Sequence, residues 1–161
     1  MSRDLNAVDR RIIEILQREG RATYAQIAQQ VGLSPAAAHE RVKKLEARGV
    51  ITGYHARVDP ALVGAGVTAF IAVSQTAGPR GYLEDVFAGM PWIEELHHVA
   101  GEESLLLKVR ASSTRALEEI IWEIRALDSV ERTKTVIALA TVFEARPLAP
   151  ATAAEDATAA G

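Results

Sequence analysis

The chain has 161 residues, 48% hydrophobic and 24% charged, which allows one ordinary hydrophobic core or two small ones stabilised by self-association. It has no cysteine, which excludes a disulfide or a cysteine-based zinc site. Its N-terminus is charged where a signal peptide would be apolar, and no apolar run is long enough to span a bilayer, so we expect a cytoplasmic protein without membrane contact. Residues 1–58 hold ten Lys and Arg against six Asp and Glu, whereas residues 59–161 hold eight against fifteen, and a basic first part favours a nucleic-acid partner.

The first helix is expected to begin after Asn6 and to end near Gly20. Asn6 is a favourable N-cap, Asp9 suits the positive end of the helix dipole, and apolar residues then recur at helical spacing. Thr23 can cap a short second helix that ends at Gly32. The sequence therefore predicts two helices joined by a short turn.

The segment LSPAAAHERVKKLEARGVI predicts a third helix, capped by Ser34, with Pro35 in its first position, that runs to about Arg48. A helical wheel gives it an apolar buried side made of Ala38, Val42 and Leu45. Small residues at the exposed start would let the helix enter a DNA groove without a steric clash, and the free N–H groups there suit a phosphate. A short helix, a tight turn and this helix match the helix-turn-helix unit, whose second helix reads the major groove.

The expected DNA-binding residues are those at the start and on the exposed side of this third helix: Ser34, Ala36, Ala37, His39, Glu40, Arg41, Lys43 and Lys44. Arg41 is the main candidate to read a base edge; alanine can contact only a thymine methyl, so DNA shape would supply part of the specificity. Glu40 could accept a hydrogen bond from cytosine or pair with Lys43 or Lys44 along the helix. A solvated amphipathic helix would explain the basic residues but not the alanine start.

The remainder of the chain predicts a ferredoxin-like unit. Residues 50–59 are interrupted by Gly53 and predict strand, turn and strand, or a wing that leads into a linker at residues 60–66. A βαββαβ order follows, with strands at residues 67–76, 93–100, 105–111 and 133–143 and helices that open at Pro79 and Ser113. The two helices would cover one face of the sheet, and the other face, which we expect to be a dimer interface, would carry Phe70, Leu106, Ile137 and Leu139.

Residues 4–144 resemble the Lrp/AsnC family of leucine-responsive and asparagine-operon regulators. The matching features of the first half are Asp9, "GRA", "IAQQVGLS", "RVKKLEARGVITGY" and "DPALVG". The segments "ELHHVAGEESLLLKVRA" and "RTKTVIALA" resemble the effector-binding half, often called the RAM domain. The resemblance implies a transcriptional regulator rather than an enzyme, without a cofactor, that binds double-stranded DNA. It also implies a homodimer formed through the sheet faces, assembly to tetramers or octamers, and modulation by a small molecule, typically an amino acid.

The effector site implied by the resemblance lies in the loop between the second and third strands and at the start of the last strand: Gly101, Glu102, Glu103, Ser104, Thr133 and Thr135. The family has an aspartate where this chain has Ser104, and that acidic position helps to hold the ammonium group of the effector. Glu102 or Glu103 could replace it. The alternative explanation of Gly101 is a hairpin turn that needs a permissive backbone, and that of the threonines is ordinary strand propensity.

The sequence therefore predicts an α+β fold in four parts: a winged helix-turn-helix DNA-binding domain at residues 1–59, a linker at 60–66, a ferredoxin-like effector-binding and oligomerisation domain at 67–146, and a disordered tail at 147–161. Three alternatives stay open. An effector-independent DNA-architectural protein would use the same helix. A small-molecule enzyme or sensor would need an acid/base or metal cluster, and a metal sensor would need more than four scattered histidines; the adjacent His97 and His98 would point to opposite faces of a strand.

Overall fold

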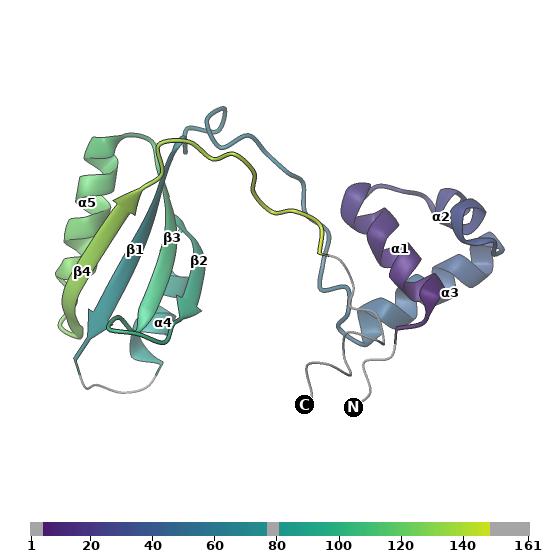
Figure 1. Cartoon of the computed structure of the whole chain (residues 1–161), viewed down its shortest axis with the longest axis horizontal. Coiled ribbons are helices and arrows are strands. Elements are labelled where there is room, and N and C mark those ends of the chain that lie inside the picture. Colours follow the sequence, from purple (N-terminus) through teal and green to yellow (C-terminus); the bar gives the residue numbers. More distant parts are fainter. Residues whose placement is uncertain (1–4, 77–80, 149–161) are drawn as a thin grey trace. The chain divides into compact units, whose positions relative to one another are not determined.

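The computed structural model describes residues 5–76 and 81–148, and the chain forms two compact units. The first unit combines the residues up to Arg57 with those from Phe143 onward, and the second runs from Val58 to Val142. Residues 143–146, which the sequence assigned to the second domain, thus pack with the first unit. The tail predicted to be disordered lies outside the described residues from residue 149 onward. Figure 1 labels the helices and strands of both units.

Polar caps begin each helix of the first unit: α1 (Ala7–Arg18), α2 (Tyr24–Val31) and α3 (Pro35–Ala47). Asn6 Oδ1 accepts a hydrogen bond from the amide of Asp9 at 2.9 Å. Thr23 and Gln26 form a reciprocal capping box, and Ser34 Oγ accepts from an amide in the first turn of α3 at 3.2 Å. Each cap satisfies N–H groups that the helix itself leaves free, a contribution of about 1 kcal/mol. The three predicted helix starts are confirmed.

The core of the first unit is a cluster of small and aliphatic side chains from all three helices: Ile12, Ile15, Ile27, Ala28, Ala38, Val42 and Leu45. The predicted buried stripe of α3 is confirmed, since its three members are at most 1% exposed. Burial of a Leu, Ile or Val side chain contributes roughly 1.5–3 kcal/mol. This packing fixes the rotation of α3 about its own axis and therefore decides which of its residues face outward.

The segment after α3 is irregular. The chain turns at Gly49, whose φ of +67° lies in the left-handed region that favours glycine. Residues 50–58, predicted as strand, turn and strand or as a wing, form no strand. Side chains hold the segment instead: the Tyr54 hydroxyl donates to Glu46 at 2.8 Å and Arg57 Nη2 donates to the carbonyl of Glu144 at 3.2 Å. The second contact joins the segment to residues near the end of the chain.

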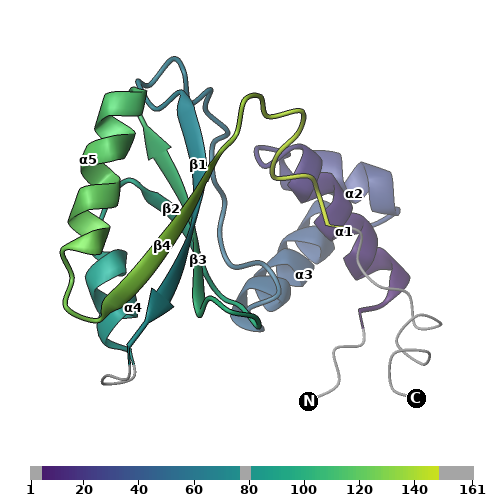
Figure 2. The ribbon, with the colours of Figure 1, turned by 60° about the vertical axis from the view of Figure 1, so that its left-hand side comes forward.

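The second unit is a four-stranded antiparallel sheet in the order β2-β3-β1-β4. Its elements in chain order are β1 (Val67–Gln75), α4 (Tyr82–Ala88), β2 (Ile93–His98), β3 (Leu105–Ala111), α5 (Thr114–Arg125) and β4 (Val130–Ile137). Both helices cover the same face of the sheet, as Figure 2 shows. The predicted ferredoxin-like βαββαβ order is confirmed. Pro79, predicted to open the first of these helices, lies outside the described residues.

The last strand ends earlier than predicted because of its partner. β4 pairs with β1 from Val130 opposite Gln75 to Ile137 opposite Ala69. Since β1 begins at Val67, residues beyond about 138 have no strand to pair with, and only the amide of Ala138 still donates to this edge. The sequence predicted this strand at residues 133–143, whereas β4 spans Val130–Ile137. The predicted start is therefore three residues too late and the predicted end six residues too late.

Register decides which residues line the face of the sheet that the helices leave open. Phe70 lies opposite Val136 on one side and Lys108 on the other, so these three side chains share that face. The placement of Ile137 on the open face was wrong: it lies opposite Ala69, on the helix-covered side. A shift of one residue along a strand moves the side chain to the other face of the sheet. Val136 therefore lies on the open face in the position predicted for Ile137.

Charged side chains cross the open face. Lys108 is only 6% exposed, and its Nζ lies 3.2 Å from Glu94 and 3.0 Å from Glu95. Arg110 Nε lies 2.8 Å from Glu94. The hydrogen bonds from Lys108 and then His97 hold the pKa of the Glu95 carboxyl below its usual range. This face therefore combines apolar residues with a paired charge network.

No helix in the described parts of the chain has the length and apolar composition needed to cross a membrane.

Candidate nucleic-acid interface

α3 presents its N-terminal start and one side to solvent. Of the residues predicted to contact DNA, the exposed ones are Ser34, Ala36, His39, Glu40, Lys43 and Lys44, whereas Ala37 and Arg41 are half-buried. The surface opposite the core stripe thus begins with small side chains and continues with basic ones. That is the arrangement expected of a helix that inserts its start into a groove and meets the phosphates further along.

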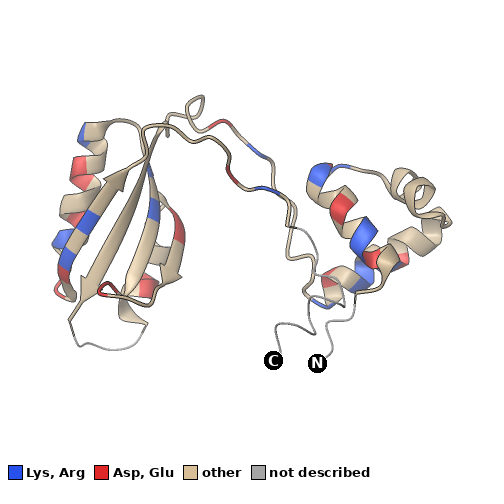
Figure 3. Ribbon diagram, viewed as in Figure 1, with Lys and Arg blue, Asp and Glu red and all other residues tan. Residues whose placement is uncertain are grey.

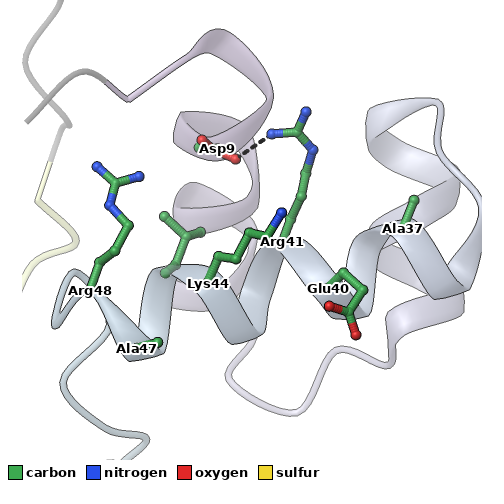
Figure 4. Close-up of a pocket in the computed structure, with 8 residues that line it drawn as sticks. Asp9, Ala37, Glu40, Arg41, Lys44, Ala47 and Arg48 are labelled. Carbon is green, nitrogen blue, oxygen red and sulfur yellow. Dashed lines mark hydrogen bonds and ion pairs between the residues drawn. The ribbon is translucent and has the colours of Figure 1, made fainter.

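An ion pair between α1 and α3 fixes the position of Arg41. Its Nη1 lies 2.8 Å from Oδ1 of Asp9, a carboxylate that is only 11% exposed. Asp9 and Arg41 are 32 residues apart in the sequence, so the pair joins the first turn of α1 to the middle of α3. The guanidinium of Arg41 consequently points toward α1 rather than straight out from the helix, as Figure 4 shows.

A hollow of about 510 Å³ lies beside this ion pair, and we call it the α1–α3 hollow. Its lining residues are Asp9, Ala37, Glu40, Arg41, Lys44, Leu45, Ala47 and Arg48. Figure 4 shows the guanidinium groups of Arg41 and Arg48 on either side of Asp9, with Lys44 between them and the carboxylate of Glu40 directed away. Arg48 and Asp9 are not among the DNA-binding residues predicted from the sequence, although the spacing of Arg48 from Arg41, two helical turns, indicates a shared face.

The opposite flank of α3 faces α2 and the segment after the helix. The ring of His39 lies 4.6 Å from the ring of Tyr24, the first residue of α2. His39 is therefore partly engaged in packing at this edge. Glu40, by contrast, forms no ion pair with Lys43 or Lys44 in the described structure.

The Tyr54 phenol, beside the end of α3, should titrate near pH 12 rather than near the ordinary value of 10. Burial disfavours the phenolate, and the Glu46 carboxylate that accepts its hydrogen bond raises the pKa further. The folded state then holds this proton more tightly than the unfolded state, so stability should decline as the pH rises from 10 toward 12. Ultraviolet titration of the chain and of Tyr54→Phe checks this, because the difference between the two curves should lie near pH 12. A difference centred near pH 10 would contradict it.

Most basic side chains on the exposed side of α3 have no acidic partner among the described residues. Figure 3 shows where Lys and Arg lie along α1 and α3. Lys43, Lys44 and Arg48 have no ion-pair partner among residues 5–76 and 81–148. Because paired cations are partly neutralised in advance, unpaired ones release more counterions when they meet phosphates. The exposed side of α3 is therefore an electropositive surface available to a polyanion.

The residues of the expected effector site lie at one end of the sheet in the second unit. The amide of Ser104 donates to the carbonyl of Val73 at 3.0 Å, and Thr133 lies opposite Val73 on β4. Arg132 Nη2 also lies 3.7 Å from Glu102, so the loop approaches the start of β4. The structure thus brings the backbone of residues 101–104 close to that of Thr133. The Thr133 side chain lies opposite Val73 on the helix-covered face, whereas Arg132 lies on the other face. Thr135 lies further along the strand, and Arg132 is not among the residues predicted from the sequence.

The adjacent histidines of β2 contact different faces of the sheet. His97 lies 3.2 Å from Glu95 on the open face, and His98 lies 3.1 Å from Glu84 of α4 on the covered face. Their predicted opposite orientation is confirmed. Within the described ranges no three His, Asp or Glu side chains gather in an arrangement suited to a metal ion.

Both units match known protein families. Residues 5–52 match the family model for winged helix-turn-helix DNA-binding, and residues 68–148 match the model for the Lrp/AsnC ligand binding domain. The HTH-type transcriptional regulator LrpA of Mycobacterium tuberculosis is 39% identical over 153 residues, which cover 93% of this chain and 100% of that protein. The chain belongs to the Lrp/AsnC family. The Leucine-responsive regulatory protein of Escherichia coli is 31% identical over 150 residues, 91% of this chain and 92% of its own length.

Solved Lrp/AsnC structures have the same architecture. A feast or famine regulatory protein of M. tuberculosis complexed with L-methionine is 38% identical, with a TM-score of 0.85 and coverage of 91% of this chain and 100% of that chain. A Neisseria meningitidis transcriptional regulator in complex with L-methionine is 25% identical, with a TM-score of 0.85 and coverage of 90% and 96%. The Lrp/AsnC relatives are named as transcriptional regulators rather than enzymes, and this chain is a DNA-binding regulator of that type.

Proposed function

We propose that this Lrp/AsnC regulator binds specific DNA sequences through α3 and that an amino acid changes its assembly and its affinity for DNA. The observation that carries the first part is the exposed surface of α3. It combines small residues at the start with basic residues that have no ion-pair partner among the described ones. The observation that supports the second part is that two solved relatives of the same fold contain L-methionine.

On the DNA side, the start of α3 would lie in the major groove. Ser34, Ala36 and Ala37 would allow close approach to the base edges, and Ser34 can in addition hydrogen-bond to a base or a phosphate. Glu40 points outward without an ion pair among the described residues, which leaves it able to accept from the amino group of cytosine. His39, packed against Tyr24, would contact the groove wall.

The basic residues further along α3 would contact the DNA backbone. Lys43 and Lys44 would bind phosphates, contacts that supply affinity without sequence information. Arg41 is tied to Asp9 on the flank toward α1, so its contribution would be to the backbone rather than to a base in the groove centre. Specificity would then depend on few base contacts and, in addition, on how easily a DNA sequence bends.

The effector would bind near the loop between β2 and β3. The family holds the ammonium group of its ligand with an acidic residue where this chain has Ser104. Glu102 already lies 3.7 Å from Arg132, whereas Glu103 is half-buried and has no ion pair in the described structure. We therefore assign the ammonium-binding role to Glu103. Gly101, Thr133 and Thr135 would complete the site.

Assembly would begin at the open face of the sheet. Phe70 and Val136 remain 39% and 58% exposed there, and an apolar surface beside a paired charge network suits a second copy of the same face. We propose a homodimer formed through this face that assembles further to a tetramer or octamer.

A second candidate function follows from Ser104. Without the family carboxylate at this position, the protein would bind and organise DNA without responding to an amino acid. The DNA-binding surface of α3 would be the same in both cases, so the two candidates differ only in the effector response.

A thermal-shift screen of the twenty amino acids tests the proposed response. A ligand that binds only the folded state at about 100 times its dissociation constant stabilises by about 2.7 kcal/mol, which should raise the melting temperature measurably. We expect such a rise for at least one amino acid, its loss in Glu103→Gln and its retention in the matched variant Glu102→Gln. No shift with any of the amino acids would support the effector-independent function instead.

A further inference from the structure

The α1–α3 hollow concentrates positive charge on one flank of α3. Arg41, Lys44 and Arg48 are spaced by three and four residues, so the three side chains rise from consecutive turns of the same face. They line the hollow together with Asp9, and Figure 4 shows all three cationic groups directed to the side of α1. Such a row of cations along a helix flank matches an extended polyanion better than a single small anion.

The charges in the hollow differ in their availability. Arg41 is engaged by Asp9 at 2.8 Å, and Glu40, the other acidic residue of the lining, points away. Lys44 and Arg48 are exposed and lack an ion-pair partner among the described residues. Two cations in this hollow are therefore free to bind an anion, while the third is held in a fixed position beside them.

We propose that the α1–α3 hollow binds one phosphodiester group of the DNA backbone, held by Lys44 and Arg48, and that Asp9 positions Arg41 beside it. The proposal rests on the DNA-binding function of α3 and extends the interface beyond the outward side of the helix to its flank. Arg48 would contact the DNA backbone. Asp9 cannot itself bind a phosphate and acts by holding Arg41 in position. Because backbone contacts carry no sequence information, this group fixes the orientation of the unit on the duplex.

The salt dependence of duplex binding tests the phosphate contact. With the full chain and a fluorescently labelled random-sequence duplex, anisotropy titrations between about 50 and 200 mM KCl give the slope of log affinity against log salt. Arg48→Ala should reduce the magnitude of this slope by about 0.9, the value for one lost phosphate contact, and Arg48→Lys should restore it. Lys43→Ala is the positive control on the outward side of α3, and Arg115→Ala, in α5 of the other unit and 88% exposed, is the negative control.

The outcomes separate the inference from the function on which it rests. An unchanged slope for Arg48→Ala, together with a reduced slope for Lys43→Ala, would overturn the phosphate contact and leave DNA binding by α3 intact. Failure of the unmodified chain to bind the duplex would overturn the function itself. Inorganic phosphate at constant ionic strength should not raise the melting temperature; a rise that Arg48→Ala abolishes would identify a free-anion site and overturn the assignment to the DNA backbone.

A double-mutant cycle of Asp9 and Arg41 tests the positioning role of Asp9. Asp9→Asn alone releases Arg41 from its fixed position and should weaken duplex binding. Arg41→Ala leaves the Asp9 carboxylate unpaired and close to the bound phosphate, where it repels the DNA. Asp9→Asn in the same chain removes that charge and should recover roughly fivefold in duplex affinity, the effect of one unfavourable charge pair about 4 Å apart in water. If Asp9→Asn changes duplex affinity equally with and without Arg41, the two residues are not coupled, and that result would overturn the positioning role.

Discussion

Duplex binding at about 0.1 M salt should fall by about 100-fold or more when Lys43 and Lys44 are both replaced by glutamate. The change removes two phosphate contacts and introduces two negative charges, and a like-charge pair about 4 Å apart costs between about 1 and 4 kcal/mol at a protein surface. Two fewer contacts should also lower the salt slope by about two. Both positions are exposed and far from the core stripe of α3, so the fold should be retained. Fluorescence anisotropy with a labelled duplex measures both quantities.

The matched control applies the same change in charge elsewhere. Arg115 and Arg125 are basic residues of α5, in the second unit. Their joint replacement by glutamate changes the net charge equally, and because exposed charges are screened beyond about 10 Å at 0.1 M salt, duplex affinity should change no more than about threefold. An equal loss in both double variants would mean that the total charge governs binding and that α3 is not the contact surface.

Replacement of Phe70 by aspartate should dissociate the proposed homodimer into monomers. The ring lies on the open face of the sheet, between Val136 on β4 and Lys108 on β3. In a two-fold dimer the change occurs twice, and each copy loses aromatic contact area and buries a carboxylate. Lys108 already pairs with two glutamates, Glu94 and Glu95, and is a poor partner for another acid. Because an unpaired charge at an interface costs about 2–5 kcal/mol, the dissociation constant should rise by roughly 100-fold or more.

Light scattering over a range of protein concentrations measures this effect. The matched control is Phe143→Asp, which makes the same change at a ring that is 62% exposed in the first unit. The control should keep the mass of the unmodified protein. An unchanged mass for Phe70→Asp would show that the open face is not the interface.

The local signals in the sequence account for most of the first unit. Each helix begins at a residue whose side chain caps it, and a cap depends only on residues within one turn, so it can be recognised without knowledge of the fold. The apolar stripe of α3 was likewise predictable from its period. A helical wheel does not show which element of the fold lies beside each flank of the helix. The pairing of Arg41 with Asp9 depends on how α1 crosses α3, a tertiary feature that no local pattern encodes.

The errors in the second unit have the same origin. A strand ends where its partner ends, and residues 138–143, which are mostly apolar, continue the pattern in sequence although β1 offers nothing to pair with them. The one-residue register of β4, which puts Val136 rather than Ile137 on the open face, is likewise fixed by β1. The loop and the threonines of the candidate effector site stay a prediction from the family resemblance, and the approach of Arg132 to Glu102 depends on the tertiary fold.

The return of the chain end to the first unit means that the polypeptide passes between the units twice. The two passages begin at neighbouring strands, β1 and β4, and at the same end of the sheet. Residues after the second passage are anchored by the side-chain amide of Gln17, which donates to the carbonyl of Leu148 at 2.8 Å and accepts from its amide at 2.6 Å. A fragment that stops at Arg57 therefore lacks the residues that bond to Gln17 and Arg57. Proteolysis of the second passage leaves the DNA-binding half covalently joined through the first, whereas after proteolysis of the first it is held only by non-covalent contacts of this kind.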